Sequence, residues 1–582
     1  MNTTPAVETE VLIVGAGPAG ASAGALLATY GIEAMMINKY NGVANTPRAH
    51  ITNQRTMEVL RDLGLERQAK AVSTPQHLMG DHVYATSLAG KELGRIRTWY
   101  THPGFKAEHD LASPTAVCDI PQDAMEPILV NAASYRGTTV RNSTELLSFE
   151  QDADGVTSTL LDRVTGEEYT VRSRYLIGAD GGRSRVAEQL ELSFEGEMAA
   201  SASMNVVFRA DLSHLVEHRT SDMYWFLQQG VGHGGVGVGV LRVVNAWDRW
   251  VGVWGFDASQ GTPELTDELG VSIAHKLIGD DTVPVEIESL STWGVNRKYA
   301  TENTRGRVFV VGDAAHRHSP MNGLGSNTSI QDSYNLAWKL ALVLRDLAGP
   351  GLLESYGQER LPIAKHLVDR TVRSEGLMPG LFKALRLPPG FAEPVLAQVL
   401  ENLEAPNDEG SERRAEFRAA MDATLACFNT HGMELNQFYD SRAVVTDGAE
   451  APVPERDVEF HYFASSFPGH HLPHAWVVKD QRKTPIFDLC GKGEFTILAG
   501  DRGAEWRAAA ADASAELGLP IRVVVIGRGG DYEDSYGDFA AAAEIGESGA
   551  LLVRPDHMIA WRTTGAADAG ELVRVLRRVL DR

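Results

Sequence analysis

Cysteine is scarce in this sequence: three of the 582 residues are cysteine, at Cys118, Cys427 and Cys490. Their wide separation excludes a CxxC pair, a zinc-type ligand spacing and a small disulfide scaffold. The chain therefore lacks the dithiol that a disulfide reductase needs. We expect no metal site, and we expect a reducing compartment, the cytoplasm, as the location of the protein.

Basic residues are also few. The 54 Lys and Arg residues oppose 77 Asp and Glu residues, which gives a net charge of −23. Nucleic-acid-binding proteins usually carry a basic domain or stripe, so we expect no nucleic-acid partner. One charge-free run, residues 11–32, is long enough to cross a membrane, but it is rich in glycine and follows two glutamates. These features argue against a membrane span or a signal peptide, and we expect no membrane association.

The first forty residues have the pattern of a dinucleotide-binding unit. Residues 9–14 predict a buried strand, residues 21–30 a helix and residues 32–38 a second strand. Between the first two lie Gly15, Gly17 and Gly20, which permit a tight turn, close approach of a diphosphate and close helix packing. Asn38 stands where an acidic partner of the ribose is expected, and its amide binds a hydroxyl more weakly than a carboxylate does.

Two further stretches combine an apolar strand with an aspartate beside glycine. Residues 175–184 place Asp180 after one apolar run, and residues 307–327 place Asp313 after another. Taken singly, either stretch fits a strand-end turn capped by the aspartate. Because they follow the first glycine motif in this order, they indicate one nucleotide site built from three distant segments.

The remaining sequence divides into segments of different character. Residues 200–295 contain short β-like runs with many aromatic residues, which predicts an antiparallel sheet. Here Gly232, Gly234 and Gly237 repeat the glycine spacing, but no helix follows, so they predict only a turn. A helix is expected at 331–347 and a surface loop at 404–411. The last 130 residues predict strands at 495–499, 522–526 and 550–554 and helices at 504–517 and 567–580.

The three motifs together resemble the single-component, class A FAD-dependent aromatic hydroxylases, the group of para-hydroxybenzoate hydroxylase and phenol hydroxylase. The resemblance covers residues 8–385, and residues 47–65 and 322–339 are most similar to the branch that acts on chlorophenols. Residues 468–474 and 552–556 resemble the thioredoxin-like tail of phenol hydroxylases, which without CxxC should lack redox chemistry.

The resemblance implies an α/β fold with a Rossmann-like FAD-binding domain, an inserted antiparallel-sheet substrate domain and a C-terminal thioredoxin-like domain. The expected FAD-binding domain comprises residues 1–80, 110–200 and 296–385, and the substrate domain comprises residues 81–109 and 201–295. A helical connection is expected at 386–450 and the thioredoxin-like domain at 451–582.

The resemblance also implies an activity. FAD, NAD(P)H as co-substrate and O2 would hydroxylate a phenol or chlorophenol next to its hydroxyl group, through a flavin C4a-hydroperoxide, to give a catechol. The partner would be a small aromatic molecule, and a homo-oligomer, dimer or tetramer, is expected. Two alternatives stay open: a hydroxylase of polycyclic, polyketide-type aromatics, and a flavin-binding protein without turnover.

Site residues follow from the resemblance, position by position. Pro320 would lie near the reactive flavin edge, and Asp180 would help to position the flavin and the nicotinamide. The other expected contacts to FAD are Gly15, Gly17, Gly20, Asn38, Arg48, Gln122, Asp313, Gly325, Ser326 and Asn327.

Phenol chemistry needs a general base, because a phenol with a pKa near 10 is mostly neutral at pH 7. His50 follows Arg48 and Ala49, where phenol hydroxylases carry an aspartate. An imidazole with a pKa near 6.5 suits this proton transfer, so we expect His50 to be the base, with a backbone or flavin contact as the alternative. Tyr224, Trp225 and Trp293 are expected to wall the ring pocket, with core packing as an equal alternative for each.

Overall fold

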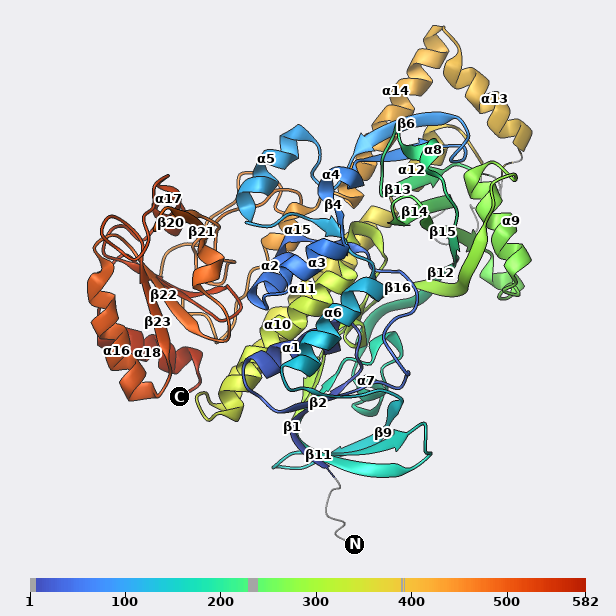
Figure 1. The fold of residues 1–582 in the computed structure, drawn as a ribbon. Coiled ribbons are helices and arrows are strands. Elements are labelled where there is room, and N and C mark those ends of the chain that lie inside the picture. Colours follow the sequence, from blue (N-terminus) through green and yellow to red (C-terminus); the bar gives the residue numbers. More distant parts are fainter. Residues whose placement is uncertain (1–6, 229–238, 389–390, 392) are drawn as a thin grey trace.

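The computed structural model describes residues 7–228, 239–388, 391 and 393–582. Figure 1 shows an N-terminal α/β body, a second body around a mostly antiparallel sheet and a smaller C-terminal α/β body. The repeated glycine spacing at Gly232, Gly234 and Gly237 lies outside the described residues. Within those residues, no helix has the length and apolar character needed to cross a membrane.

The N-terminal body is built on a mixed sheet in which β1 pairs in parallel with β2 and β11, and β11 with β18. Because parallel strands end at the same edge, the loops after β1, β11 and β18 meet there. Helices α1 (Pro18–Thr29), α6 (Gln122–Tyr135) and α10 (Gly325–Leu344) share one apolar cluster with this sheet. The strands are β1 (Val7–Val14), β2 (Ala34–Ile37), β8 (Thr139–Arg141), β9 (Thr144–Gln151), β10 (Val156–Asp162), β11 (Glu168–Gly178), β17 (Thr304–Arg305) and β18 (Val308–Val310).

A short three-stranded sheet lies beside the main sheet. Its middle strand β7 (Cys118–Asp119) pairs with β3 (Ile51–Thr52) and β4 (Thr74–Pro75). Helix α2 (Gln54–Asp62) begins directly after β3, capped by Asn53. The neighbouring helices are α3 (Glu66–Val72), α4 (Gln76–Met79), α5 (Pro103–Ala112) and α7 (Arg185–Gln189).

The second body is an eight-stranded sheet in the order β19-β16-β12-β15-β14-β13-β5-β6. One face packs against α9 (Asp267–Ile278), and the other lies over the loops of the N-terminal body. The strands are β5 (Asp81–Ala85), β6 (Glu92–Arg97), β12 (Phe194–Arg209), β13 (Met223–Phe226), β14 (Gly239–Asn245), β15 (Arg249–Phe256), β16 (Glu286–Ala300) and β19 (His316–Arg317). Helix α8 (Ser213–Val216) lies between β12 and β13. The helices after the sheet are α11 (Glu354–Glu375), α12 (Pro379–Ala384), α13 (Glu393–Glu404), α14 (Asp408–Ala423) and α15 (His431–Leu435).

Two expected boundaries are wrong. Helix α10 begins at Gly325, within the stretch expected to be a loop, because Asn327 donates hydrogen bonds to the Ile51 and Gly323 carbonyls and holds this first turn in place. The expected loop 404–411 is mostly helical, since Asn407 caps α14 and only three residues separate α13 from α14.

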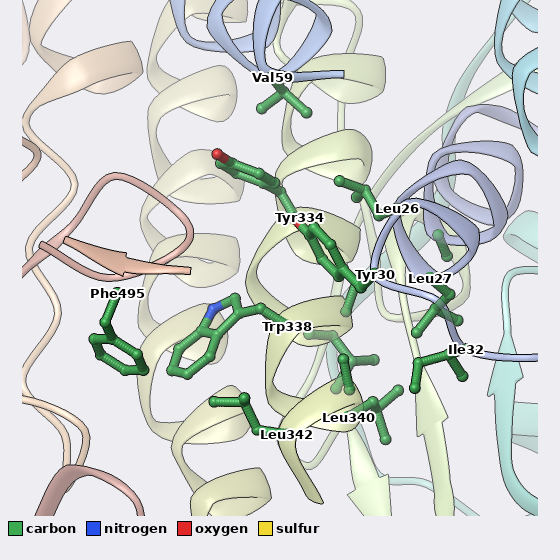
Figure 2. Packing of buried hydrophobic residues seen from close by; sticks show 14 of the residues in the cluster. Leu26, Leu27, Tyr30, Ile32, Val59, Tyr334, Trp338, Leu340, Leu342 and Phe495 are labelled. Atoms are coloured by element: carbon green, nitrogen blue, oxygen red, sulfur yellow. The ribbon is translucent and has the colours of Figure 1, made fainter. Parts of the chain in front are cut away.

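The C-terminal body contains a four-stranded sheet in the order β23-β22-β24-β25. Its expected strands and helices are confirmed to within two residues. Figure 2 shows how it joins the N-terminal body: Trp338 of α10 meets the ring of Phe495 edge-on at 5.7 Å. The elements are β20 (Trp476–Lys479), β21 (Arg482–Pro485), β22 (Phe495–Ala499), β23 (Ile521–Val525), β24 (Ala550–Val553), β25 (Ile559–Thr563), α16 (Trp506–Leu517), α17 (Asp538–Ala543) and α18 (Ala569–Val579).

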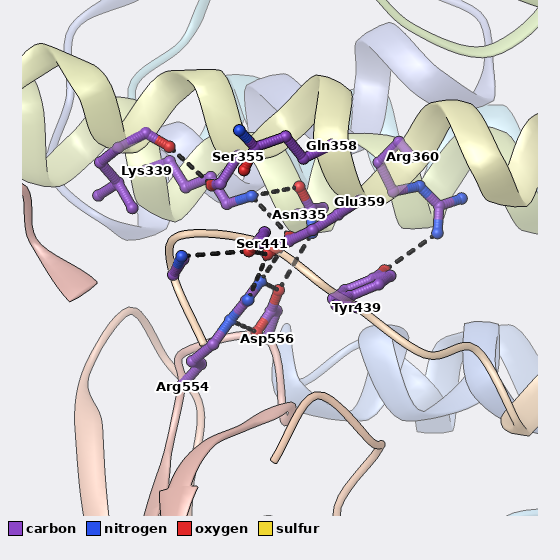
Figure 3. A network of polar contacts seen from close by, with 12 residues as sticks. Asn335, Lys339, Ser355, Gln358, Glu359, Arg360, Tyr439, Ser441, Arg554 and Asp556 are labelled. Atoms are coloured by element: carbon purple, nitrogen blue, oxygen red, sulfur yellow. Dashed lines mark hydrogen bonds and ion pairs between the residues drawn. The ribbon is translucent and has the colours of Figure 1, made fainter. Parts of the chain in front are cut away.

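A fully buried charged network crosses the same junction (Figure 3). Arg554 of the C-terminal body pairs with Glu359 of α11 at 2.6 Å, and Glu359 also accepts a bond from Lys339 at 2.7 Å. Asp556 binds the other side of the Arg554 guanidinium at 2.6 Å. Since buried charges are tolerated only when paired, the two bodies are held in one fixed relation.

Candidate active site

The first glycine motif forms a turn into which side chains do not fit. Gly15 has φ +109°, and a Cβ there would collide with the Ala179 carbonyl oxygen. A Cβ on Gly20 would collide with the Gly15 carbonyl oxygen. Gly17 differs: a Cβ there would have only Glu126 Oε1 nearby, at 3.8 Å. The chain's own packing therefore explains Gly15 and Gly20, whereas Gly17 leaves open space for a bound group.

Gly17 is also the N-cap of α1, and its helix begins with Pro18 and has no side-chain cap. The first backbone N–H groups of a helix have no partner within the helix, and the helix dipole favours an anion there. This uncapped end, next to an open glycine, fits a diphosphate.

The three sequence motifs meet at this point. Ala179 N donates to Val14 O at 2.8 Å, and Val311 N donates to Gly178 O at 3.0 Å. A small cleft beside them is lined by residues of four segments: Pro18, Ala49, Thr52, Gln122 and Ser326. The structure thus brings residues near 15, 50, 122, 180, 313 and 326 into one region.

Arg48 and Gln122 lie side by side, since Gln122 N donates to Arg48 O at 2.8 Å. The Arg48 residue is exposed. The Gln122 amide donates to Glu126 Oε1 at 2.5 Å, and Glu126 Oε2 accepts from Ala44 N at 2.5 Å. Burial raises the pKa of Glu126. Glu126 therefore lies beside Gly17 and holds the loop at Ala44 in place.

The side chains of Asn38 and Asp180 form hydrogen bonds within the loops that follow their strands. The Asn38 amide donates to Gly42 O at 2.7 Å and accepts from Tyr40 N at 3.2 Å, which closes the loop after β2. Asp180 accepts from Ser184 Oγ at 2.5 Å and Arg185 N at 2.7 Å, and so ties down the start of α7. Asn38 and Asp180 therefore position the backbone of the loop after β2 and of the start of α7.

Asp313 and the first turn of α10 both offer polar groups for which the structure records no hydrogen bond within the described residues. Asp313 is exposed, and the structure records no hydrogen bond to its carboxylate from the described residues. Gly325 and Ser326 form the first turn of α10, so their backbone N–H groups lack partners within the helix. The Asn327 side chain is engaged in structural hydrogen bonds, because its Oδ1 accepts a hydrogen bond from Asn53 N at 3.0 Å.

The base candidate has a carboxylate partner that the sequence did not predict. His50 Nδ1 lies 3.1 Å from Asp119 Oδ1, and both side chains are almost fully buried. Arg242 Nη2 of β14 donates to Asp119 Oδ2 at 2.5 Å. Burial and the Arg242 charge lower the pKa of His50. Despite burial, Arg242 and His50 hold the pKa of Asp119 at about 2, so Asp119 is ionised.

The aromatic residues expected around the ring pocket do not share one face. Trp225 belongs to the apolar cluster that includes Ile51 and Met321, the neighbours of His50 and Pro320. Tyr224 points to the opposite face, toward α9, since successive strand residues alternate. Trp293 is half-buried on β16 and donates to Asn205 Oδ1 at 2.7 Å. Trp225 and Tyr224 therefore cannot wall the same pocket.

Three functional candidates were missed from the sequence: Asp119, Arg242 and Glu126. Asp119 directly precedes the Ile-Pro-Gln segment that contains Gln122, which is a signal of position but not of partner. Arg242 comes from another body altogether, so only the folded chain reveals its contact with Asp119. Within the described residues, no cluster of three or more His, Cys, Asp or Glu residues is arranged to hold a metal ion.

Family comparison decides between the nucleotide-binding folds that this geometry allows. The model of the FAD binding domain matches residues 8–371, and that of the aromatic-ring hydroxylase C-terminal domain matches residues 465–582. The chain belongs to the FAD-dependent aromatic-ring hydroxylases. The expected α/β fold class is confirmed, and so is the resemblance on which it rests.

Relatives match over nearly the whole length. The chain is 52% identical to a 2,4-dichlorophenol 6-monooxygenase of Cupriavidus pinatubonensis, over 99% of this chain and 97% of that protein. It is 47% identical to a phenol 2-monooxygenase of Pseudomonas sp., over 96% and 91%. The crystal structure of the flavin-dependent monooxygenase PieE with FAD and substrate matches with TM-score 0.94 and 41% identity, over 99% and 100%. The protein is an FAD-dependent monooxygenase.

Proposed function

We propose that this hydroxylase converts a phenol or chlorophenol to a catechol by ortho hydroxylation, with NAD(P)H as reductant and O2 as the oxygen source. The observation that carries the proposal is the buried His50–Asp119 pair beside the cleft. A hydroxylase of phenols needs to remove the phenol proton, and a buried imidazole paired with a carboxylate is suited to that step. The two relatives named for phenol and chlorophenol substrates support the same substrate class.

The residues around the cleft fit FAD. The uncapped end of α1 at Gly17 and the exposed Arg48 would hold the diphosphate, and Gln122 and Glu126 would hold the adjoining ribose. Asp313 would bind the ribityl hydroxyls, and the first turn of α10 would donate N–H groups to the flavin pyrimidine edge. Bound FAD supplies the electron-transfer and oxygen-transfer chemistry that no side chain provides.

The chain itself handles the proton. Asp119 is ionised and accepts the Nδ1 proton of His50, so Nε2 carries the lone pair. The structure records no hydrogen bond for Nε2 among the described residues. We propose that Nε2 takes the phenol proton, and that Asp119 stabilises the resulting imidazolium. The phenolate is the more electron-rich ring and the better acceptor of oxygen at the carbon beside its hydroxyl group.

Burial and Arg242 together set the strength of this base. Burial and, after it, the Arg242 charge lower the imidazole pKa, which keeps His50 neutral at pH 7. The Arg242 guanidinium shares Asp119 with His50. A neutral imidazole can accept a proton, whereas an imidazolium cannot. The same ion pair joins the second body to the N-terminal body at the site, since Arg242 lies on β14 and Asp119 on β7.

The proposal is tested by following NAD(P)H oxidation and O2 uptake of the FAD-loaded protein with single-ring phenols, chlorophenols and polycyclic phenols. We expect single-ring phenols to accelerate both rates and to yield catechols. Acceleration by the polycyclic phenols alone would favour the polycyclic alternative. A flavin-binding protein without turnover would show no phenol-dependent rate with any compound.

A further inference from the structure

A second buried histidine–carboxylate pair lies on the sheet of the second body. His82 of β5 and Asp222, directly before β13, are both almost fully buried, and His82 Nε2 lies 3.0 Å from Asp222 Oδ1. The other ring nitrogen, Nδ1, accepts the indole N–H of Trp225 at 3.1 Å. Since an indole nitrogen only donates, Nδ1 is unprotonated and Nε2–H donates to Asp222. His82 therefore bridges Trp225 to a fixed carboxylate.

The second oxygen of Asp222 extends this bridge. It accepts the indole N–H of Trp99 at 3.0 Å and lies 3.5 Å from Arg242 Nη2. The same Arg242 nitrogen binds Asp119, the partner of His50. The Asp222 and Asp119 carboxylates, joined by the Arg242 guanidinium, therefore hold both indoles and the base in place.

Trp225 occupies a place where its orientation matters. Its apolar cluster contains Ile51 and Met321, which neighbour His50 and Pro320 in the chain. Phe428 approaches the indole at 5.7 Å, and also lies edge-on to His82 at 4.2 Å. The packing limits the indole on its faces, and the bond to His82 fixes its rotation. Without an acceptor, the buried N–H would be unpaired and the ring would turn toward another partner.

We propose that His82 is a specificity-determining residue, which holds the Trp225 indole in one orientation and so fixes the size of aromatic ring that fits beside His50. The inference rests on the proposed function, because it takes the space next to Trp225 as the phenol pocket. His82 does not touch the reacting atoms; it acts through Trp225. A pocket wall held by one hydrogen bond discriminates between ring sizes without any change at the base.

The test uses oxidised, FAD-loaded protein without nicotinamide, so that binding is measured apart from turnover. Dissociation constants of phenol and 2-naphthol are determined from the change that each causes in the flavin absorbance spectrum. In His82→Phe, which neither accepts nor donates, we expect the ratio of the two constants to shift in favour of 2-naphthol by about tenfold, the range typical of altered apolar pockets. His82→Gln, whose amide both accepts and donates, should restore a ratio close to that of the parent protein.

Two further variants keep the test decisive. Leucine is smaller than phenylalanine and also cannot bond the indole. If His82→Phe does not retain FAD, His82→Leu must show the same shift in the ratio of the two dissociation constants. In a Trp225→Phe background, His82→Phe should add little, because the indole through which it acts is gone. A full additional shift there would overturn the inference.

Failure of the inference is separable from failure of the proposed function. If the parent protein binds both compounds and His82→Phe leaves their ratio unchanged, His82 does not set specificity, while the phenol pocket stands. If the parent binds neither phenol nor 2-naphthol, the proposed function fails and this inference fails with it.

Discussion

His50 Nδ1 and Asp119 Oδ1 lie 3.1 Å apart although 69 positions separate the two residues in the chain. Two very short strands make this possible: β3 and β7 pair antiparallel with Ile51 opposite Asp119, and Ile120 N donates to His50 O at 2.7 Å. The pair is therefore set by backbone hydrogen bonds rather than by flexible side chains. Such fixed placement is what a general base requires.

Replacing the base should slow hydroxylation most where the phenol is neutral. For His50→Ala we expect phenol-dependent catechol formation at pH 7 to fall by about 10²–10⁴-fold, the usual contribution of a general base. The loss should shrink as pH approaches the phenol pKa near 10, because the substrate then ionises unaided. Steady-state rates between pH 6 and pH 10 measure this; a constant deficit across that range would contradict a role as base.

Removing the carboxylate partner should affect the same step while the ring stays in place. Asp119→Asn preserves size, but its amide also offers a donor to Nδ1 and permits the wrong imidazole tautomer. We expect a large fall in kcat at neutral pH with intact FAD binding. Flavin content and the rate with phenol are measured together, and Asp369→Asn on α11 serves as the control, because Asp369 forms an exposed pair with Lys365. Full activity of Asp119→Asn would remove Asp119 from the mechanism.

The Arg242 charge predicts the direction of a pH shift. Burial and the Arg242 charge lower the pKa of His50, and the base must be neutral, so activity is lost as pH falls through that pKa. Arg242→Met removes one of these two influences and should move the acidic limb of the kcat/KM profile to higher pH. Replacement of the exposed Arg209 on β12 of the same sheet, Arg209→Met, should leave the limb in place. A shift of Arg242→Met toward lower pH would contradict this role.

Gly17 offers a test of FAD binding that spares the fold. Its φ of −69° suits any residue, and a Cβ would come no closer than 3.8 Å to another protein atom. Gly17→Ala should therefore keep the thermal stability of the FAD-free protein but weaken FAD binding. Gly15→Ala should destabilise the protein itself, because φ is +109° and the Ala179 carbonyl is in the way. Equal FAD affinity in Gly17→Ala and the parent would place the diphosphate elsewhere.

The buried charges between α11 and the C-terminal body predict a stability effect. Arg554→Met leaves Glu359 buried with fewer partners, which should cost about 3–5 kcal/mol of unfolding free energy. The exposed pair Arg507–Asp531 in the same body provides the control, and Arg507→Met should cost less than about 1 kcal/mol. Urea unfolding of both variants measures the difference; equal values would show that the junction does not depend on this network.

The sequence predicted those parts of the site that local patterns encode. The turn at Gly15–Gly20 follows from glycine spacing between a strand and a helix, and the aspartates near 180 and 313 follow from strand ends. Partners across bodies could not be predicted, since nothing near Asp119 in the chain points to Arg242. Tyr224 and Trp225 are consecutive residues of one strand, so strand alternation places them on opposite faces of the sheet. The start of α10 cannot be predicted from its own residues, because these favour loops and the tertiary hydrogen bonds of Asn327 override that preference.

Incorporation of isotopic oxygen tests the central claim most directly. FAD-loaded protein, NAD(P)H and a phenol are incubated under ¹⁸O2, and the product is analysed by mass spectrometry. The account predicts a catechol that carries a single ¹⁸O atom beside the original hydroxyl group. Oxidation of NAD(P)H that yields only hydrogen peroxide, with no labelled catechol from any phenol tested, would contradict it.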